Sequence, residues 1–236
     1  MLAISNKGPG IGDKVQFGYV PENHFLNTGE KVIDISKSFV FDYNPYIIRE
    51  YKIEDITHYC DLWSIRFPTT EYQSLADRMS NFLGWRKCYL RHPRLYQFED
   101  IDIQPRTVIV HTNGKMEGGI MSDKTIETIY KNYKGWEITQ LGGINDRDTP
   151  FKKSLGTSFW ESAKLIASSQ IFISVNSSMM NIANCYPKIH RKVVIIRDDL
   201  PKYYLINKGY GWIDYNWSYY NETEYDIGIT MSYKKI

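Results

Sequence analysis

The run Ser168-Ser-Gln-Ile-Phe-Ile-Ser-Val-Asn-Ser-Ser-Met-Met-Asn-Ile-Ala-Asn184 decides the fold that this sequence predicts. Ile171 to Val175 is typical of a buried strand, Asn176-Ser177-Ser178 of a tight polar turn, and a small-residue helix is expected from about Met179. A strand that ends in a polar turn and opens a helix presents free backbone N–H groups. Together with the helix dipole, these groups favour a bound anion such as phosphate. In an open α/β sheet, ligands lie at this carboxyl end of a strand.

The same alternation of strands and helices extends over the surrounding chain. Strands are expected at Thr107 to His111, Glu137 to Leu141 and Lys192 to Ile196. Helices are expected at Asp123 to Tyr133 and from Ser158, where Ser158-Phe-Trp-Glu161 has the form of a capping box. A glycine-containing loop, Thr112 to Ser122, and a polar loop that runs from Gly142-Gly143 to Thr157 join these elements. Strands that alternate with helices imply a parallel sheet with right-handed crossovers.

The first 36 residues predict a second, smaller unit of the same kind. A short apolar strand, Met1 to Ser5, is followed by the glycine-rich loop Asn6 to Asp13, a helix from Lys14 to Phe25 and a strand from Lys31 to Ser36. This order is a βαβ unit. The glycines do not have the Gly-x-Gly-x-x-Gly spacing of a dinucleotide site.

The sequence therefore predicts an α/β protein with two lobes and a tail. We place an N-terminal α/β lobe at residues 1–104 and a C-terminal α/β lobe at 105–200. The tail, 201–236, holds eight tyrosines and two tryptophans between Tyr203 and Ile236. We expect it to pack on the body, because exposing so many rings would be costly.

Composition excludes several classes of function. A net charge of +2 gives no general attraction to nucleic acid, so no nucleic-acid partner is expected. The three cysteines, Cys60, Cys88 and Cys185, are far apart, which indicates reduced thiols and a cytoplasmic protein. No apolar run is long enough for a transmembrane segment, while peripheral membrane contact stays open. The five histidines are scattered, so no metal site is expected.

Three ordered blocks, together about half of the chain, resemble a known family. They are Gly10-Ile-Gly-Asp13, the stretch from Val108-Ile-Val-His-Thr-Asn-Gly-Lys115 to Leu141-Gly-Gly143, and Ser158 to Ala183. The sequence is similar to glycosyltransferase family 9, the heptosyltransferases that use ADP-heptose. This resemblance implies the GT-B architecture, in which two Rossmann-like lobes face each other across a cleft, here with a reduced N-terminal lobe. Where the family has Asp, a small residue, Gly and later His, this chain has Asn176, Ser177, Ser178 and Asn181, which leaves the donor sugar open.

Sugar transfer needs a base for the acceptor hydroxyl, a cradle for the departing diphosphate and groups that orient both substrates. Asp13 is our candidate base, because it follows a glycine turn at the carboxyl end of the first strand, and the resemblance implies the same role. The alternative is that Asp13 caps the helix that follows. Gly12 beside it allows close approach of the donor.

The remaining candidates bind the donor and follow strands of the C-terminal lobe. Thr112, Asn113 and Lys115 offer a hydroxyl, an amide and an ammonium group for the diphosphate; the alternative is an ordinary solvated loop. Gly142 and Gly143 leave room for a base or ribose, and Asn145 and Asp146 are placed to bond the nucleoside or simply to form a turn. Asn176, Ser177, Ser178 and Asn181 surround the predicted helix start, with plain serine capping as the alternative. His111 fits a core histidine as well as a ligand contact.

These residues predict a metal-independent glycosyltransferase of the hexosyl or heptosyl type. It would move a sugar from a nucleotide-diphospho-sugar to an acceptor hydroxyl on a glycan, a lipid-linked molecule or a protein. The nucleotide sugar would be a co-substrate, and no cofactor is expected. Two alternatives stay open: a sugar-nucleotide hydrolase or 2-epimerase on the same fold, and a non-catalytic module that binds nucleotides or sugars.

Overall fold

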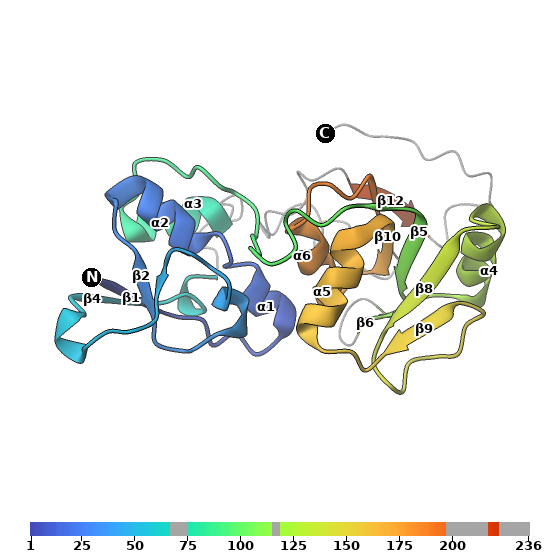
Figure 1. Ribbon diagram of the computed structural model, residues 1–236, viewed down its shortest axis with the longest axis horizontal. Coiled ribbons are helices and arrows are strands. Elements are labelled where there is room, and N and C mark those ends of the chain that lie inside the picture. Colours follow the sequence, from blue (N-terminus) through green and yellow to red (C-terminus); the bar gives the residue numbers. More distant parts are fainter. Residues whose placement is uncertain (67–74, 115–118, 197–216, 222–236) are drawn as a thin grey trace. The chain divides into compact units, whose positions relative to one another are not determined.

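Two parallel β-sheets form the framework of the chain, one in each half of the sequence (Figure 1). The computed structural model describes residues 1–66, 75–114, 119–196 and 217–221. It divides into two units, with the boundary in the connecting segment between Glu99 and Asp100. The described residues up to Glu99 are called unit 1, and those from Asp100 onward unit 2. The predicted α/β class is confirmed, since both sheets are parallel and carry helices.

Unit 1 has a four-stranded parallel sheet with the order β3-β2-β1-β4. Its strands are β1 (Leu2–Ser5), β2 (Val32–Asp34), β3 (Ile47–Ile48) and β4 (His58–Asp61). Its helices are α1 (Ile11–Val15), α2 (Val20–Thr28) and α3 (Leu75–Leu83), with 3-10 turns η1 (Phe39–Phe41), η2 (Ile53–Asp55) and η3 (Ser64–Arg66). The predicted βαβ unit is therefore confirmed.

The prediction of a single helix from Lys14 to Phe25 was wrong. Two short helices, α1 and α2, occupy this region, and Gly18 lies in the turn between them. A Cβ atom at Gly18 would lie 2.3 Å from the carbonyl oxygen of Arg94, so the backbone around Arg94 passes directly against this turn. Pro21 stands in the first turn of α2, where the missing N–H of proline costs nothing.

Asparagines on α2 fasten the chain that leaves α3. The buried Asn23 amide donates to the Leu90 carbonyl (2.7 Å) and accepts from the N–H groups of Tyr89 (2.7 Å) and Leu90 (3.0 Å). One turn later the partly exposed Asn27 makes equivalent bonds to the backbone of Arg86 and Lys87. The two side chains thus supply the backbone hydrogen bonds that an irregular segment lacks.

Unit 2 is built on a six-stranded parallel sheet with the order β12-β11-β10-β5-β8-β9. Its strands are β5 (Gln104–His111), β8 (Glu137–Gly142), β9 (Lys152–Leu155), β10 (Ser169–Val175), β11 (Arg191–Ile196) and β12 (Trp217–Asn221). Its helices are α4 (Asp123–Asn132), α5 (Phe159–Ser168) and α6 (Ser178–Asn184). A small hairpin, β6 (Asn113–Gly114) and β7 (Gly119–Ile120), follows β5.

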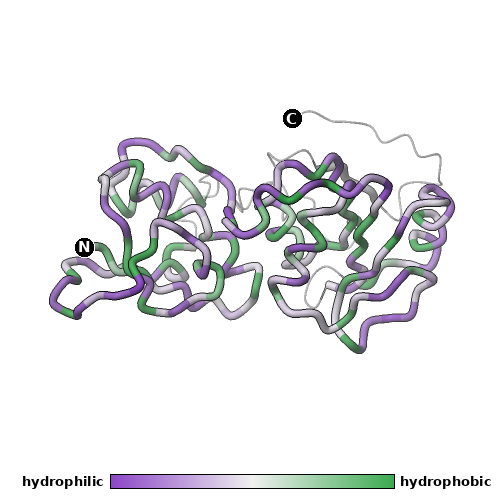
Figure 2. Tube along the Cα trace, in the orientation of Figure 1, coloured by the Kyte–Doolittle hydropathy of each residue, from purple (hydrophilic) through white to green (hydrophobic). Residues whose placement is uncertain are grey.

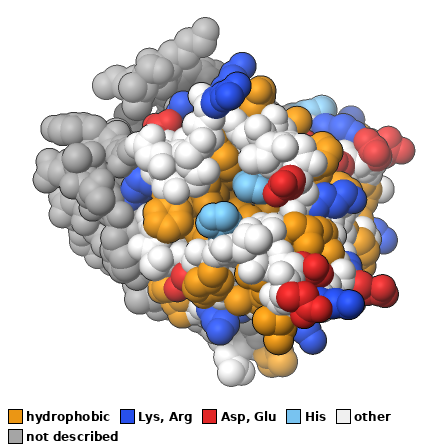
Figure 3. Space-filling model, turned by 90° about the vertical axis from the view of Figure 1, so that its left-hand side faces the viewer, with side chains coloured by type: hydrophobic (Ala, Val, Ile, Leu, Met, Phe, Trp, Pro, Cys, Tyr) orange, Lys and Arg blue, Asp and Glu red, His pale blue; other side chains and the backbone are white. Residues whose placement is uncertain are grey.

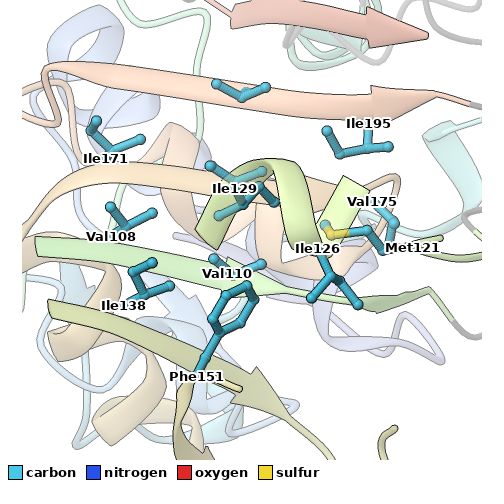
Figure 4. Close-up of a cluster of buried hydrophobic side chains, with 12 residues drawn as sticks. Val108, Val110, Met121, Ile126, Ile129, Ile138, Phe151, Ile171, Val175 and Ile195 are labelled. Atoms are coloured by element: carbon cyan, nitrogen blue, oxygen red, sulfur yellow. The ribbon is translucent and has the colours of Figure 1, made fainter. Parts of the chain in front are cut away.

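The strands of this sheet contain many hydrophobic residues (Figure 2), and most of these are buried. On one face, Ile126 and Ile129 of α4 pack over Val108, Val110 and neighbouring strand residues (Figure 4). Alternate strand residues such as Ile109 and Phe172 point to the other face, where α5 and α6 pack against β5 and β10. A sheet covered on both faces leaves only its strand ends accessible to a ligand.

The long polar loop predicted up to Thr157 contains strand β9, so that part of the prediction was wrong. β9 is paired with β8 and with no other strand among the described residues, which makes it an edge strand. An edge strand is half solvated and does not need the apolar run by which buried strands are recognised. The capping box at Ser158 and Glu161 is confirmed at the start of α5. Of the tail, only β12 lies among the described residues.

The part of the surface drawn in Figure 3 is neither mainly basic nor mainly acidic. On the face drawn in Figure 3, basic and acidic side chains of the described residues are interspersed. None of the helices in the described ranges has the length and hydropathy that crossing a bilayer requires. The three cysteines are free.

We predict that Asn23→Ala lowers the free energy of unfolding by about 3 kcal/mol, because it leaves several buried backbone groups without partners. Asn27→Ala is the matched control: it removes the same kind of bonds at a partly exposed position, and we expect a loss of about 1 kcal/mol. Urea unfolding of both variants measures the difference. Equal losses in the two variants would show that burial at Asn23 does not matter.

Candidate functional site

The strand order of unit 2 places a topological switch point between β5 and β10. From β5 the chain proceeds to β8 and β9 on one side; it then returns through α5 to β10 and continues to β11 on the other side. The connections that follow β5 and β10 therefore leave in opposite directions. In open parallel sheets, ligands bind outside the carboxyl ends of the two strands at such a point.

Three polar side chains meet at these two strand ends. His111 closes β5 and is paired in register with Ser174 near the end of β10. The His111 Nδ1 atom lies 3.0 Å from the Ser177 hydroxyl and 3.5 Å from the Ser174 hydroxyl, and the two hydroxyls are 3.1 Å apart. Ser177 also caps α6, accepting from the Met179 N–H at 3.3 Å. We call His111, Ser174 and Ser177 the switch-point cluster.

The His111 ring is buried and held neutral. Burial lowers its pKa from 6.5 to about 4, and the Asp146 carboxylate opposes this by raising it. At neutral pH the switch-point cluster therefore carries no charge of its own. Ser174 is a member that the sequence analysis missed. The sequence did contain a sign of its role, because Ser174 is the one polar residue in the otherwise apolar run Ile171-Phe-Ile-Ser-Val175.

A tight turn built on Asp146 follows the neighbouring strand β8. The Asp146 carboxylate accepts from the Gly143 N–H (3.0 Å) and from the Asn113 side-chain amide (3.1 Å). A Cβ atom at Gly142 would lie 1.9 Å from an Asp146 oxygen, so a larger residue there would displace the Asp146 carboxylate. The room left by Gly142 is thus filled by Asp146, while Gly143 is exposed. Asp146 links the predicted residues Asn113, Gly142 and Gly143.

The Thr112 side chain is buried inside unit 2. Its hydroxyl accepts from the Gln140 amide at 3.2 Å, and Gln140 also bonds the Arg147 carbonyl and the Thr149 hydroxyl. This arrangement fixes the loops after β5 and β8 to each other. Thr112, one of the predicted donor-binding residues, is thus fully buried and bonded to Gln140 in this structure.

The other donor-binding candidates lie at the same edge of the sheet. Asn176 and Ser177 form the turn after β10, Ser178 is the first residue of α6, and Asn181 lies on the next turn of that helix. All four are partly exposed, and Asn145 in the Asp146 turn is exposed. Lys115 falls outside the described residues. Across the described ranges, no three His, Cys, Asp or Glu side chains gather closely enough to hold a metal ion.

Asp13 lies in unit 1, within α1, and caps this helix itself and not a helix that follows it. Its Oδ2 atom accepts from the Gly10 N–H at 3.0 Å and so caps α1. Its other oxygen, Oδ1, has no partner within the part of the chain that the structure describes. A carboxylate has two oxygens, so a cap on one leaves the other available for a second contact. Gly12 is buried in the same helix.

Comparison of the sequence with known proteins finds neither a family model nor a curated protein that matches. Comparison of the fold does find matches among solved structures. A glycosyl transferase family 9 protein from Veillonella parvula superposes with a TM-score of 0.65 at 11% identity, over 93% of this chain and 85% of that one. The E. coli heptosyltransferase WaaC, solved with ADP-2-deoxy-2-fluoro heptose, gives 0.61 at 7% identity, over 85% of this chain and 90% of that one.

The iron-containing dodecameric glycosyltransferase TibC from enterotoxigenic E. coli gives a TM-score of 0.60 at 14% identity. The match covers 82% of this chain and 59% of TibC, so this chain spans less than two thirds of that protein. At such low identities the likeness concerns the fold. The fold of this chain resembles that of the family 9 glycosyltransferases, and the resemblance that the three sequence blocks indicated is confirmed.

Proposed function

We propose that this protein is a glycosyltransferase that moves a sugar from a nucleotide-diphospho-sugar to an acceptor hydroxyl. The observation that carries the proposal is the switch-point cluster, a set of hydrogen-bonding groups at the one edge of unit 2 where parallel sheets bind ligands. The fold likeness to family 9 glycosyltransferases supports it from an independent direction.

The proposed roles follow from the position of each group. Asn176, Ser177 and Ser178 hold the diphosphate, with Asn181 and Lys115 as further contacts. The turn of Gly142 and Gly143, fixed by Asp146, receives the nucleoside together with Asn113 and Asn145. Thr112 keeps these loops in place. Such hydrogen-bond donors, together with the Lys115 ammonium group, stabilise a leaving diphosphate without requiring a bound metal ion.

Asp13 is proposed as the base of the transfer step. Its free Oδ1 oxygen would take the proton of the acceptor hydroxyl as that oxygen bonds to the anomeric carbon of the sugar. The bond between this carbon and the diphosphate oxygen breaks at the same time, and its electron pair leaves with the nucleoside diphosphate. The cap to Gly10 holds the carboxylate in one orientation, which favours this use.

His111 would serve as a neutral hydrogen-bond donor. The Ser174 hydroxyl donates to the Val175 carbonyl at 2.6 Å, so Ser177 is the hydroxyl available to donate to Nδ1 of His111. A ring that accepts at Nδ1 carries its proton on Nε2. The low pKa keeps the ring neutral at physiological pH, so Nε2–H remains a donor whose strength does not change between pH 6 and pH 8.

We predict that a nucleotide-sugar donor raises the melting temperature of the protein by several degrees. A ligand present at 100 times its Kd stabilises a protein by about 2.7 kcal/mol. A thermal-shift panel of ADP-, UDP-, GDP-, CDP- and dTDP-sugars identifies the donor. Ser177→Ala should weaken its affinity about tenfold, because it removes the cap that orders the start of α6 and the hydrogen bond that orients His111.

Ser158→Ala is the matched control for Ser177→Ala. It removes the same cap from α5, costs about 1 kcal/mol of stability and should leave donor affinity unchanged. The proposal fails if no nucleotide sugar in the panel shifts the melting temperature, or if both serine variants weaken the donor equally.

Asp13→Asn separates catalysis from capping, because an amide oxygen still accepts the Gly10 N–H but takes no proton. We predict that turnover, measured as nucleoside diphosphate release with acceptor, falls about 10²- to 10⁴-fold while the melting temperature is kept. Asp55→Asn changes the same capping position in η2 and should leave turnover intact. Full activity of the Asp13→Asn variant would show that Asp13 only caps α1. If the unmodified protein binds the donor but shows no turnover, the protein is a binding module and not an enzyme.

The buried His111 makes stability depend on pH in a defined window. Its pKa in the folded state, about 4, lies below its usual 6.5, so between these values the unfolded chain binds a proton that the folded chain does not. Lowering the pH from 7 to 5 should therefore remove about 2 kcal/mol of stability through this residue. Urea unfolding of the unmodified protein and of His111→Asn measures this term as their difference. A difference that does not change with pH would contradict a buried neutral ring.

A further inference from the structure

We infer that Asp34 and Ser36, in the turn that follows β2, position the Asp13 carboxylate through the backbone of the loop and helix after β1. This inference rests on the proposed function, in which Asp13 is the base, and goes beyond it by assigning two positioning residues. Neither was among the site residues that the sequence indicated. The predicted strand extended to Ser36, whereas β2 ends at Asp34 and leaves Ser36 in a turn.

The Asp34 carboxylate organises the turn after β2. Its Oδ1 atom accepts from the Ser36 N–H at 3.0 Å and from the Ser36 hydroxyl at 2.5 Å, and its Oδ2 atom accepts from the Ser38 N–H at 2.6 Å. Asp34 is buried, with 6% of its surface exposed. Lys37 in the same turn has a φ of 49°, in the left-handed region that residues other than glycine rarely adopt. Three hydrogen bonds to one buried carboxylate therefore hold a turn whose backbone is otherwise unfavourable.

The Ser36 hydroxyl connects this turn to the loop after β1. Because the hydroxyl donates its hydrogen to Asp34, its oxygen is the atom that accepts from the Asn6 N–H, at 2.9 Å. Asn6 is buried and directly follows β1. Its side-chain amide donates to the carbonyl of Lys14, the residue after Asp13, at 3.0 Å. A continuous chain of hydrogen bonds thus leads from the Asp34 carboxylate to the backbone beside Asp13.

Helix α1 depends on contacts of this kind for its orientation. It has only five residues, and a helix of that length is not stable in isolation. A second contact joins the same two segments, since the Lys14 ammonium lies 5.4 Å from the centroid of the Phe39 ring in η1, just after the turn. The turn after β2 therefore fixes α1 at its backbone, through Asn6, and at a side chain.

The position of α1 matters because a general base acts only within hydrogen-bond distance of the proton it takes, and small displacements lower the rate. The bond from the Gly10 N–H fixes the Asp13 carboxylate relative to its own helix. The chain through Ser36 fixes that helix relative to the sheet of unit 1. Loss of the Ser36 hydroxyl should therefore lower the turnover number and leave the affinity for the donor unchanged, since the proposed donor site lies in unit 2.

Ser36→Ala tests this inference, because it breaks the connection to Asn6 and leaves the Asp34 carboxylate with two backbone N–H groups. Ser38→Ala is the matched control: it makes the same change in the same turn, at a hydroxyl without a hydrogen-bond partner in the described part of the chain. With saturating donor and acceptor, we expect Ser36→Ala to lower kcat about tenfold and Ser38→Ala to leave it unchanged. Ser36→Thr, which keeps a hydroxyl, should restore most of kcat.

The double variant with Asp13→Asn shows whether Ser36 acts through Asp13. Once the base has been removed, its orientation no longer affects the rate. Adding Ser36→Ala to Asp13→Asn should therefore lower kcat by less than about twofold. A further tenfold loss in that background would show a general structural effect and would overturn the inference.

Hydrogen–deuterium exchange of peptides that cover residues 6–16 measures the same connection without any substrate. We expect faster exchange in Ser36→Ala than in Ser38→Ala or the unmodified protein. Equal exchange in the two serine variants, or equal kcat, would overturn the inference. An unmodified protein that releases no nucleoside diphosphate contradicts the proposed function instead, and the exchange result then still decides whether Ser36 fixes α1.

Discussion

The pairing of β5 with β10 is the constraint on which the rest of unit 2 depends. It places His111 opposite Ser174 and brings the end of the first strand of the six-stranded sheet next to the end of the fourth strand of that sheet in chain order. The connections that follow these two strands leave in opposite directions. Neither connection therefore covers the polar groups at this edge. The buried hydrophobic faces of the sheet fix this edge in position, because a register slip would disrupt the packing of α4 on one face and of α5 and α6 on the other.

Both units have polar groups where two neighbouring parallel strands end, in a four-stranded sheet in unit 1 and in a six-stranded sheet in unit 2. In unit 1 the helix that follows β1 carries the Asp13 carboxylate. In unit 2 the edge between β5 and β10 carries hydroxyls, an imidazole and amide groups without a carboxylate in the switch-point cluster. The groups in unit 1 can accept hydrogen bonds, and those in unit 2 can donate them. This division fits an acceptor hydroxyl on one unit and a diphosphate on the other.

The sequence predicted the elements whose signal is local. The apolar run before Asn176 and the capping box at Ser158 depend on neighbouring residues, and both were found in the structure. Features that depend on distant partners were missed. The break between α1 and α2 arises where the Arg94 backbone meets Gly18, and Thr112 is buried because Gln140 of another strand bonds it. Asp146 fills the space at Gly142 for the same reason, since only the folded turn brings the two together.

The central claim is that the diphosphate of a donor binds at the edge between β5 and β10. Hydrogen–deuterium exchange of the protein, with and without saturating nucleoside diphosphate chosen from ADP, UDP, GDP, CDP and dTDP, tests it most directly. The account predicts slower exchange in peptides that cover residues 111–114 and 174–181, because bound phosphate oxygens engage the backbone N–H groups there. Protection confined to other parts of the chain, with these two segments unchanged, would contradict it.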